Sequence, residues 1–588
     1  MYVKVGIDAG DFTYETQLPV KPGCMVVVPF KRTTKIGWVI DILREPNLPE
    51  VTKLRKVRQL ISRKPVIENN LIQLAKWVAN YYVAEVGHVI EHMLPQSVRR
   101  KSITRLLPKA KEFEIKNVRP QVDVLWEVDP TVRWNYYKHA IERTLSEGKD
   151  VLVLVPEHRD HRMLQDVPFY TSELRDSDKK RLWLALRRGD LRVVCGTRSA
   201  VFLPFRELGL IIVEREDSKH YKEQDHPHYH ARDVAIMRAM FEGIKVILGT
   251  GSPSLETYLN IKKGKYRLVN EPKFDGLRIN VITLRKKQIF SPELRRKIGN
   301  ILHRGGKVVL FMNLRGYSRY LICEDCGHTL RCPTCGVGLV YYRAGKLLRC
   351  HYCGYKEVAP TVCPNCRGTN IRYVRLGVER VVRRARALFP EVSIIQIDSD
   401  TPEPEASRWH EYQIVVGTEA IFRYVEFDKV DLVAVIDADS QLMFPNFRSY
   451  ERLLQTIVRF YPAEIVIQTR RPWLPVIKYL RGGKMMEFYE DELHRRVGLG
   501  YPPHLHMVRV VVERKTSPTV GRVLDKVVDR LDGIRFLGPA DCPLPNLRGK
   551  RRAHVLIKTE YPPALHDVLL GMYRELKVKV DVDPIEIV

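Results

Sequence analysis

Four Cys-x-x-Cys pairs constrain this chain more than any other feature. They fall within a stretch of 44 residues, as Cys323/Cys326, Cys332/Cys335, Cys350/Cys353 and Cys363/Cys366. Each pair can direct two sulfurs at one ion, and a glycine after the second cysteine allows the turn a positive φ. Two pairs complete one tetrahedral zinc site, so the sequence predicts two closed, structural zinc sites. Disulfides are the alternative, but the spacing is typical of zinc ribbons and no feature indicates secretion.

The spacing favours one way of combining the pairs. Cys332/Cys335 and Cys350/Cys353 form a Cys-x2-Cys-x14-Cys-x2-Cys ribbon, which we name the inner site (Zn 2). The flanking pairs, Cys323/Cys326 and Cys363/Cys366, would then close the outer site (Zn 1). Side-by-side pairing is the alternative, and the spacing alone does not exclude it.

The charge balance indicates the kind of partner. The chain has 588 residues, and its 98 Lys and Arg against 69 Asp and Glu give a net charge of +29. A chain this basic is expected to bind a polyanion, with nucleic acid the first candidate, whereas a thermophile-like charged surface would balance its signs. The remaining cysteines, Cys24, Cys195 and Cys542, are expected to be buried or free thiols. No apolar run spans a membrane and no signal sequence is evident, which predicts a cytoplasmic protein.

The first 100 residues are expected to form a small domain. Strand-like segments at 3–7, 26–30 and 37–40 predict a small β-barrel, and helical spacing follows over 71–82. The region also contains Phe12-Thr-Tyr14, Val28-Pro-Phe30, Gly37, and Trp77 to Tyr82 ahead of Leu94-Pro95. In these residues the chain resembles the bacterial replication restart family PriA, also called primosomal protein N′.

The resemblance implies that residues 1–100 hold the 3′ end of a nascent DNA strand. By position, the pocket residues would be Phe12, Thr13, Tyr14, Lys31 and Arg55. An aromatic ring would stack on the terminal base, a polar group would bond the 3′ hydroxyl, and the cations would meet phosphate. Thr13 stands where the family often has aspartate, which is expected to weaken recognition of the hydroxyl.

The middle of the chain alternates apolar runs with helical patterns, which indicates buried parallel strands in α/β lobes. The runs are Val151–Val155, Leu210–Val213, Val246–Leu248, Val308–Phe311 and Ile414–Val416. Several segments resemble superfamily 2 helicase motifs as PriA carries them: Gly196–Ala200, Tyr229–Asp233, Gly249–Pro253, Asn313–Tyr317, Gly417-Thr418, and Asp437–Asp439 with Phe447–Gln455. The resemblance implies two RecA-like lobes, in which Arg198 and residues 313–317 are expected to line a DNA path.

The resemblance also covers the C-terminal region, and it leaves a gap in the middle. The family usually carries a winged-helix domain after the N-terminal domain, but only a short basic linker follows here, with Arg99–Lys101 and Lys109–Lys111. We expect it to touch the DNA backbone, with a solvated loop as the alternative. The densest basic cluster of the C-terminal region is expected to contact phosphate, with a solvated turn as the alternative. It comprises Arg548, Lys550, Arg551 and Arg552.

The nucleotide-binding motifs of the family are degenerate. No Gly-x-x-x-x-Gly-Lys-[Ser/Thr] sequence occurs, and residues 130–134 stand in its place, with Arg133 for the lysine and Trp134 for the magnesium ligand. The Asp-Glu-Glu-His segment of the family becomes Glu214, Arg215, Glu216 and Asp217. The last motif has no evident arginine finger. We therefore predict no catalytic residues and no use of ATP.

The sequence as a whole predicts a multidomain α/β protein without a winged-helix domain. The expected parts are the N-terminal domain (1–100), a basic linker (101–125), lobe 1 (126–275), lobe 2 (276–320 and 371–480), an inserted double zinc-ribbon element (321–370) and a C-terminal α+β domain (481–588).

The resemblance implies a DNA-binding protein of the primosome that recognises stalled or abandoned forks and promotes replication restart and replicative-helicase loading. Two Zn²⁺ ions per chain are expected. Forked and single-stranded DNA, primosome proteins, a helicase loader and single-strand-binding protein are the expected partners. Two alternatives remain: an active ATP-dependent 3′→5′ helicase with a non-standard nucleotide site, and a zinc-ribbon module unrelated to restart.

Overall fold

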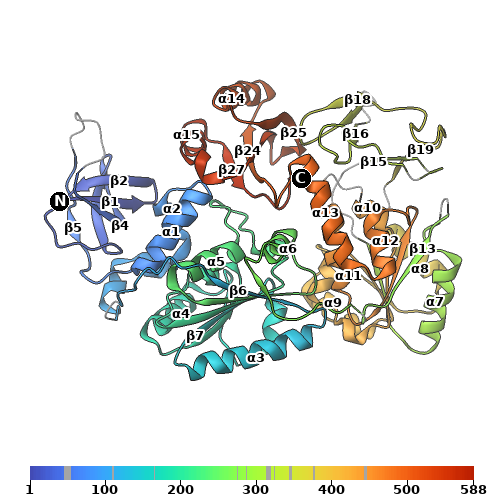
Figure 1. Ribbon diagram of the computed structural model, residues 1–588, viewed down its shortest axis with the longest axis horizontal. Helices are drawn as coiled ribbons and strands as arrows, with labels where there is room; N and C mark the ends of the chain where they lie inside the picture. The colour runs from blue at the N-terminus through green and yellow to red at the C-terminus, as the bar shows by residue number, and fades with distance from the viewer. Residues whose placement is uncertain are drawn as a thin grey trace.

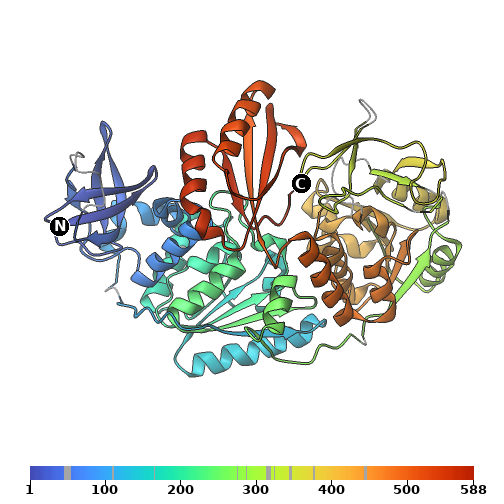
Figure 2. The same ribbon diagram turned by 45° about the horizontal axis from the view of Figure 1, so that its top comes forward.

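The computed structural model describes residues 1–45, 54–108, 111–164, 166–274, 276–285, 288–312, 320–323, 325–326, 328–342, 347–374, 378–442 and 446–587. The N-terminal domain lies at one end of the molecule and lobe 2 at the other, with lobe 1 between them (Figure 1). The C-terminal domain lies above the junction of the two lobes, beside the cysteine-rich element, as the turned view also shows (Figure 2). None of the helices that the structure describes is long and apolar enough to cross a membrane.

The N-terminal domain contains the expected β-barrel. Its antiparallel strands have the order β2-β1-β4-β3-β5, and a bridge between Glu15 and Lys56 brings the β2 edge against the segment that leads into β5. Apolar residues at alternate positions of β1 and β3 fill the interior. The strands and helices are β1 (Tyr2–Ile7), β2 (Gly10–Glu15), β3 (Met25–Phe30), β4 (Thr33–Leu43), β5 (Gln59–Leu60), α1 (Asn69–Tyr81) and α2 (Val86–Met93).

Lobe 1 is built on a parallel sheet with the order β12-β6-β11-β10-β7-β9-β8. The apolar runs are its central strands, and α3 packs on one face while α4 and α5 pack on the other. Its elements are β6 (Gln121–Trp126), α3 (Pro130–Ser146), β7 (Asp150–Leu154), β8 (Phe169–Tyr170), α4 (Asp176–Arg188), β9 (Val193–Gly196), β10 (Leu208–Glu214), α5 (Ala231–Glu242), β11 (Lys245–Thr250), α6 (Leu255–Lys262) and β12 (Arg267–Leu268).

Lobe 2 is a second parallel sheet, with the order β13-β23-β22-β14-β21-β20. The two lobes expected from the apolar runs are thus present. The elements are β13 (Ile279–Thr283), α7 (Pro292–His303), β14 (Val308–Phe311), α8 (Val378–Leu388), β20 (Ile394–Ile397), α9 (Glu403–Ala406), β21 (Ile414–Gly417), β22 (Leu432–Val435), α10 (Ala438–Leu442), α11 (Ser449–Val458), β23 (Glu464–Thr469), α12 (Pro475–Gly482) and α13 (Met485–Leu499).

The cysteine-rich element and the C-terminal domain complete the molecule. The first consists of short antiparallel strands, β15 (Tyr320–Cys323) with β19 (Ile371–Val374), and β16 (Val340–Tyr342), β17 (Leu347–Arg349) and β18 (Lys356–Val358). The second is the expected α+β domain, an antiparallel sheet in the order β25-β26-β24-β27 with α14 and α15 on one face. Its elements are β24 (His506–Arg514), α14 (Ser517–Asp529), β25 (Phe536–Leu547), β26 (Lys550–Thr559), α15 (His566–Leu576) and β27 (Lys579–Val582).

The elements divide the chain at points that differ from the expected boundaries. Strand β6 begins at Gln121 and pairs with β11, so the last residues of the expected linker belong to the sheet of lobe 1. Helix α13, expected in the C-terminal domain, packs Phe488, Tyr489 and Leu493 into the core of lobe 2. Both differences have the same cause. A segment packs into the core that its apolar side chains reach in the folded chain, and the sequence does not show which core that is. No folded domain lies between α2 and β6 among the described residues.

Candidate functional site

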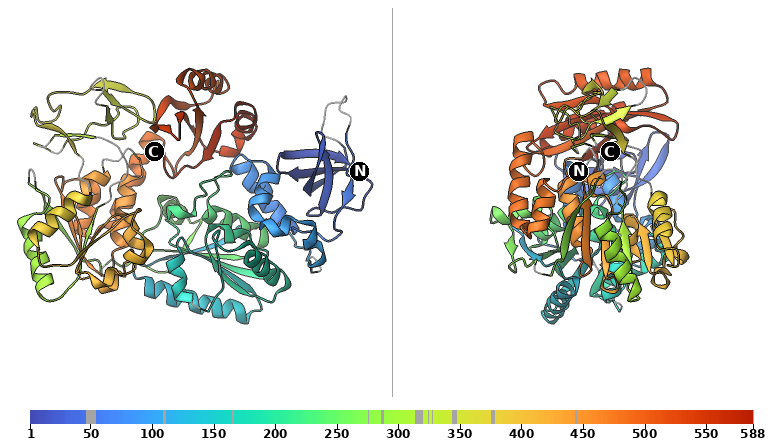
Figure 3. Two further views of the ribbon diagram at one scale, coloured as in Figure 1. Left: turned by 180° about the vertical axis from the view of Figure 1, so that it is seen from behind. Right: turned by 90° about the vertical axis from the view of Figure 1, so that its right-hand side faces the viewer.

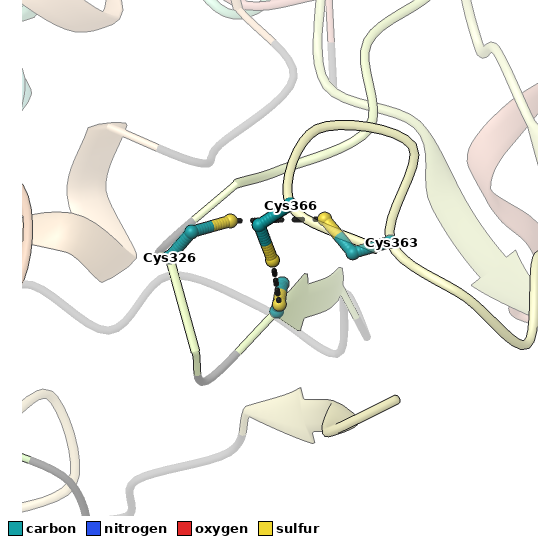
Figure 4. Close-up of side chains that lie close together, drawn as sticks. Cys326, Cys363 and Cys366 are labelled. Carbon is teal, nitrogen blue, oxygen red and sulfur yellow. Dashed lines mark hydrogen bonds between the residues drawn. The ribbon is translucent and has the colours of Figure 1, made fainter. Parts of the chain in front are cut away.

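The eight cysteines of the 323–366 stretch lie in two groups of four. In each group all four sulfurs lie within 4.8 Å of one another. In the outer site the Sγ–Sγ distances are 3.6 Å for Cys323 and Cys366 and 3.7 Å for Cys326 and Cys363 (Figure 4). A zinc ion about 2.3 Å from each sulfur places the sulfurs about 3.8 Å apart. Both groups therefore fit a tetrahedral ion.

The inner site contains Cys332, Cys335, Cys350 and Cys353, with Cys332 and Cys353 at an Sγ–Sγ distance of 3.5 Å. The cysteines thus group as the favoured spacing has them, and not side by side. A disulfide has its sulfurs about 2.05 Å apart. All eleven cysteines are free thiols in the structure, so the disulfide alternative is wrong.

Glycines after the cysteine pairs shape the turns of the inner site. Gly336 has φ +66° and Gly354 has φ +80°, and each donates its N–H to the first cysteine of its pair, at 2.8 and 3.1 Å. A Cβ on Gly354 would lie 2.8 Å from the carbonyl oxygen of Pro539 in the C-terminal domain. This glycine therefore serves both the turn and the close approach of two domains.

The inner site is held against the C-terminal domain by packing and hydrogen bonds. The cysteines of this site share one apolar cluster with Tyr352, Tyr501 and Leu556. The Tyr501 hydroxyl donates to the Cys335 carbonyl at 2.8 Å, and a His554 ring nitrogen lies 2.6 Å from the His351 carbonyl. The metal ligands are thus part of the interface that fixes the C-terminal domain.

The position of the phosphate loop is occupied by an ordinary helix start. Helix α3 begins with Pro130, and the Asp129 carboxylate accepts a hydrogen bond from the Thr131 N–H at 2.7 Å. In phosphate-binding loops the free N–H groups at a helix N-terminus bind the anion. Here a carboxylate already takes that place, so a phosphate would meet a like charge.

Arg133, which replaces the lysine, is committed to a buried ion pair. Its Nε and Nη2 donate to the Glu214 carboxylate, at 3.1 and 2.6 Å, and its Nη1 donates to the Glu127 carbonyl at 2.6 Å. The two side chains are only 5% and 3% exposed. Burial alone would raise the pKa of Glu214, but the charge and hydrogen bonds of Arg133 and the Tyr137 hydroxyl hold it below its usual range. The cation is therefore not presented to a nucleotide.

The neighbouring positions are filled as well. Trp134 is buried edge-to-face on Tyr137, with ring centroids 5.3 Å apart. Arg215, at φ +49°, donates to Asp160 at 3.0 Å. The cavity that Arg133, Trp134 and Arg215 line has a volume of about 100 Å³, below the roughly 300–1,000 Å³ of typical ligand pockets. A separate cavity of about 520 Å³, which Arg215 and Asp217 line together with Arg448 and Glu451 of lobe 2, does not include Arg133 or Trp134.

The two remaining acidic side chains of this segment are also engaged. Glu216 accepts hydrogen bonds from Arg232 Nη1 at 2.8 Å and from the Ser254 N–H at 2.7 Å. Asp217 accepts from the Thr250 hydroxyl at 2.6 Å. These two acids thus stabilise loops of lobe 1, while Arg215 occupies the position of the acid that activates water in an ATPase of this class.

At the rim of the N-terminal barrel the structure brings together most of the predicted pocket residues. Phe12 is 37% exposed and lies against Phe30, with ring centroids 5.2 Å apart. Lys31 Nζ lies 5.6 Å from the Phe30 ring, and Arg55 donates to the Lys31 carbonyl at 2.7 Å. Phe30 was not among the predicted pocket residues. An aromatic at the end of a strand, next to a cation, is the signal that identifies it.

The other two predicted pocket residues are less exposed than Phe12. Tyr14 is buried in the barrel and donates to the Pro29 carbonyl at 3.2 Å. Thr13 pairs with Lys4, while Phe12 and Tyr14 pair with Val5 and Val3 of the barrel interior, so alternation places Thr13 on the outer face of the strand.

The predicted basic cluster of the C-terminal domain forms the β25–β26 hairpin and is only partly free. Arg551 pairs with Asp541 at 2.7 Å and Arg552 with Glu513 at 2.9 Å. Arg548 and Lys550, at the tip, are exposed and make no ion pair with any residue that the structure describes. These two are therefore the free cations of the cluster.

Other predicted DNA contacts have different outcomes. Arg198 pairs with Glu223 at 2.8 Å. The motif at 313–317 and Lys109 lie outside the described residues. In the linker, Arg100 and Lys101 are exposed, whereas Arg99 donates to the Glu91 and Leu94 carbonyls and Lys111 pairs with Glu207.

Sequence reasoning missed the residues that join the lobes. Arg448 of lobe 2 contacts Glu256 of lobe 1 at 2.5 Å and Glu451 at 3.3 Å, and Arg496 contacts Glu451 at 2.8 Å. The Leu255 N–H donates to Glu451 at 3.0 Å. Trp126, Leu255 and Tyr258 of lobe 1 also belong to the apolar core of lobe 2. Arg448 and Glu451 lie in the Phe447–Gln455 motif, but the motif does not show which residues of lobe 1 they contact. The lobes are thus joined by a shared core, by the Arg448–Glu256 ion pair and by the hydrogen bond from Leu255 to Glu451.

Family models match three parts of the chain. The model for the 3'DNA-binding domain (3'BD) of PriA matches residues 4–95. The PriA DNA helicase Cys-rich region (CRR) domain matches residues 332–357, and the Primosomal protein N C-terminal domain matches residues 498–585.

The chain is also similar to curated replication restart proteins named PriA. It is 31% identical to that of Chlamydia pneumoniae, over 80% of this chain and 69% of that protein. It is 30% identical to that of Bacillus subtilis, over 79% of this chain and 64% of that protein. For Rickettsia felis the identity is 29%, over 98% of this chain and 97% of that protein.

Proposed function

The chain belongs to the PriA family of replication restart proteins, and we propose that it binds stalled or abandoned replication forks as a scaffold that does not hydrolyse ATP. In this proposal it recognises forked and single-stranded DNA and promotes restart and replicative-helicase loading. Its partners are primosome proteins, a helicase loader and single-strand-binding protein, and its location is the cytoplasm at the nucleoid. Two Zn²⁺ ions held by the two four-cysteine groups stabilise the element beside the C-terminal domain.

The main support for the proposal that ATP is not hydrolysed is the buried ion pair between Arg133 and Glu214. A phosphate-binding cation must be free to meet the nucleotide, and a Walker-type acid must be free to bind magnesium. Here each neutralises the other, with Tyr137 as a further partner of the carboxylate. Separating them to admit ATP would expose two unpaired charges in a buried site, which costs several kcal/mol.

The joined lobes support the same proposal. A helicase motor of this class moves its two lobes against each other in each ATP cycle. The shared core around Trp126 and Tyr258 and the Glu256–Arg448–Glu451 network would have to open in such a cycle. A protein that only presents DNA-binding surfaces in fixed relative positions has no such requirement.

In each site the four cysteine thiolates fill all coordination positions of a zinc ion, so no position is left for water. When bound, the ion supplies folding free energy and no catalysis, because four thiolates leave no open coordination position. Cys326 receives a further contact from the Asn365 amide at 3.5 Å, and Cys366 from the Gly368 N–H at 3.4 Å. Such donors stabilise the negative charge of the thiolates.

Recognition of the 3′ end is proposed for the barrel rim, and Phe12 offers the cleanest test. Phe12→Ala removes an exposed ring, whereas Tyr14→Ala would leave a cavity in the barrel core. We expect Phe12→Ala to weaken binding of a fork with a free 3′ nascent end by about 1–3 kcal/mol, the worth of one base–aromatic contact. Its affinity for a fork blocked by a 3′-phosphate should change little, and its salt dependence should stay the same.

Fluorescence anisotropy on both forks across a salt series measures these quantities. Arg548→Ala is the matched comparison, because it removes a free cation far from the barrel. This variant should weaken binding of both forks equally, and it should lower the dependence of log affinity on log salt concentration by about 0.9. If Phe12→Ala weakened both forks equally, the barrel rim would not be an end-recognition pocket.

A further inference from the structure

Helices α7 and α8 form the outer face of lobe 2. Leu294 and Ile298 of α7 and Val381 and Ala385 of α8 belong to one apolar cluster with the strands beneath them. Both helices therefore cover the same face of the sheet. They lie at the end of the molecule opposite the N-terminal domain, as the front view and the view from behind agree (Figures 1 and 3).

The solvent side of these two helices is strongly basic. Their exposed acids are only Glu293 and Glu379. The exposed cations are Arg295, Arg296, Arg380, Arg383, Arg384 and Arg386. None of these arginines forms an ion pair with any residue in the described part of the chain, in contrast to Arg551 and Arg552 of the C-terminal hairpin.

This distribution of charge is unfavourable for the isolated helix. Arg380 lies three and four residues before Arg383 and Arg384, and like charges at these spacings cost about 0.2–0.5 kcal/mol per pair. Arg380 is also in the first turn, where the helix dipole disfavours a cation. Burial of Val381, Val382 and Ala385 holds the helix in place instead. A polyanion against this face would relieve the repulsion.

The composition of the two helices distinguishes between kinds of nucleic acid. Single strands are bound through aromatic rings that stack on bases, and neither helix contains Phe, Tyr or Trp. Guanidinium groups alone suit the phosphates of a duplex, whose bases are already stacked. At 1.5 Å per residue the 11 residues of α8 extend about 16 Å, which is the rise of about five base pairs along a duplex axis at 3.4 Å each.

We propose that the arginine face of α7 and α8 binds the phosphate backbone of a double-stranded arm of the DNA, without reading its sequence. This inference rests on the proposed function, because it assigns a second contact to a fork already bound elsewhere. The barrel rim and this face lie at opposite ends of one joined body. The protein would therefore hold two parts of one branched DNA at a fixed separation.

The test uses the full chain with Arg383 and Arg384 both replaced by alanine. The substrates are a fork with duplex arms of about 30 base pairs, roughly 100 Å long, and a short 3′-ended single strand. We expect the double variant to bind the long-armed fork roughly tenfold more weakly near physiological salt, and to lower its salt slope by about 2, at about 0.9 per lost phosphate contact. Binding of the short strand should not change.

Arg143→Ala with Arg408→Ala is the matched control. It removes the same charge from exposed positions that are already paired, with Glu147 and Glu411. If the control weakened the long-armed fork as much as the double variant, or if the double variant bound it like the wild type, the α7–α8 face would not be a duplex site. If the wild type bound neither DNA, the proposed function itself would fail, which is a separate outcome.

Discussion

Replacing Glu214 by alanine is expected to lower the free energy of unfolding by about 3–5 kcal/mol, because it leaves the buried Arg133 guanidinium without its counter-charge. In an enzyme that uses this carboxylate for catalysis, its loss would abolish turnover and leave the fold largely intact. Here the acid serves the fold. Denaturant unfolding of the wild type and the variant, followed by circular dichroism, measures the difference.

The matched control replaces both partners, as Arg133→Met with Glu214→Leu. Apolar pairs of similar volume often substitute for buried ion pairs without loss of stability, so the double variant should regain most of the stability that Glu214→Ala loses. The pKa of Glu214 is lowered by Arg133, so the contribution of the pair is present above the unfolded pKa and is lost as the pH falls. Equal stability of Glu214→Ala and the wild type at neutral pH would contradict the account.

Replacing Cys350 by serine is expected to remove one of two zinc ions and to loosen the C-terminal domain. Cys350 is buried in the cluster that contains Tyr352, Tyr501 and Leu556, so loss of its ion disrupts the packing between two domains. Structural zinc contributes about 10–16 kcal/mol in isolated zinc-finger peptides, which sets the upper limit of the effect. Elemental analysis should give one zinc per chain, and limited proteolysis should release the C-terminal domain.

Cys366→Ser provides the control for that experiment. Cys366 is exposed and belongs to the outer site, whose ligands lie outside the cluster against the C-terminal domain. This variant should also lose one zinc ion but keep the C-terminal domain resistant to protease. Two ions retained in Cys350→Ser, or iron in place of zinc in the wild type, would overturn the assignment of the sites.

The features that followed from the sequence are those that a short stretch of chain determines. Continuous apolar runs such as Val151–Val155 predicted buried parallel strands, because both faces of such a strand are covered. The cysteine spacing favoured the grouping that the structure has, because two Cys-x-x-Cys pairs separated by 14 residues form a ribbon of the usual length. The loss of the phosphate loop was also local, because Arg133 and Trp134 are adjacent in sequence.

What the sequence did not show depends on contacts between distant segments. The sequence showed that Arg133 replaces the lysine of the phosphate loop. It did not show that Arg133 pairs with Glu214, because the two residues are far apart in the chain. Arg551 was expected to be free, yet Asp541 lies across the hairpin from it. Tyr14 alternates into the barrel, which becomes clear only once its pairing with Val3 is known. The arginine run of α8 was not singled out from the sequence, because only the fold shows which side of the helix faces solvent.

The most direct test of the account is ATP turnover by a preparation that has been shown to bind forked DNA. The same sample is measured with ATP alone, with ATP and a saturating fork, and against a buffer blank. Because Arg133 and Glu214 are paired and the cavity beside them is about 100 Å³, the account predicts no turnover above the blank with or without DNA. DNA-stimulated turnover of about 1 s⁻¹ or more, the low end for ordinary enzymes, would contradict it and would favour an active helicase with a non-standard nucleotide site.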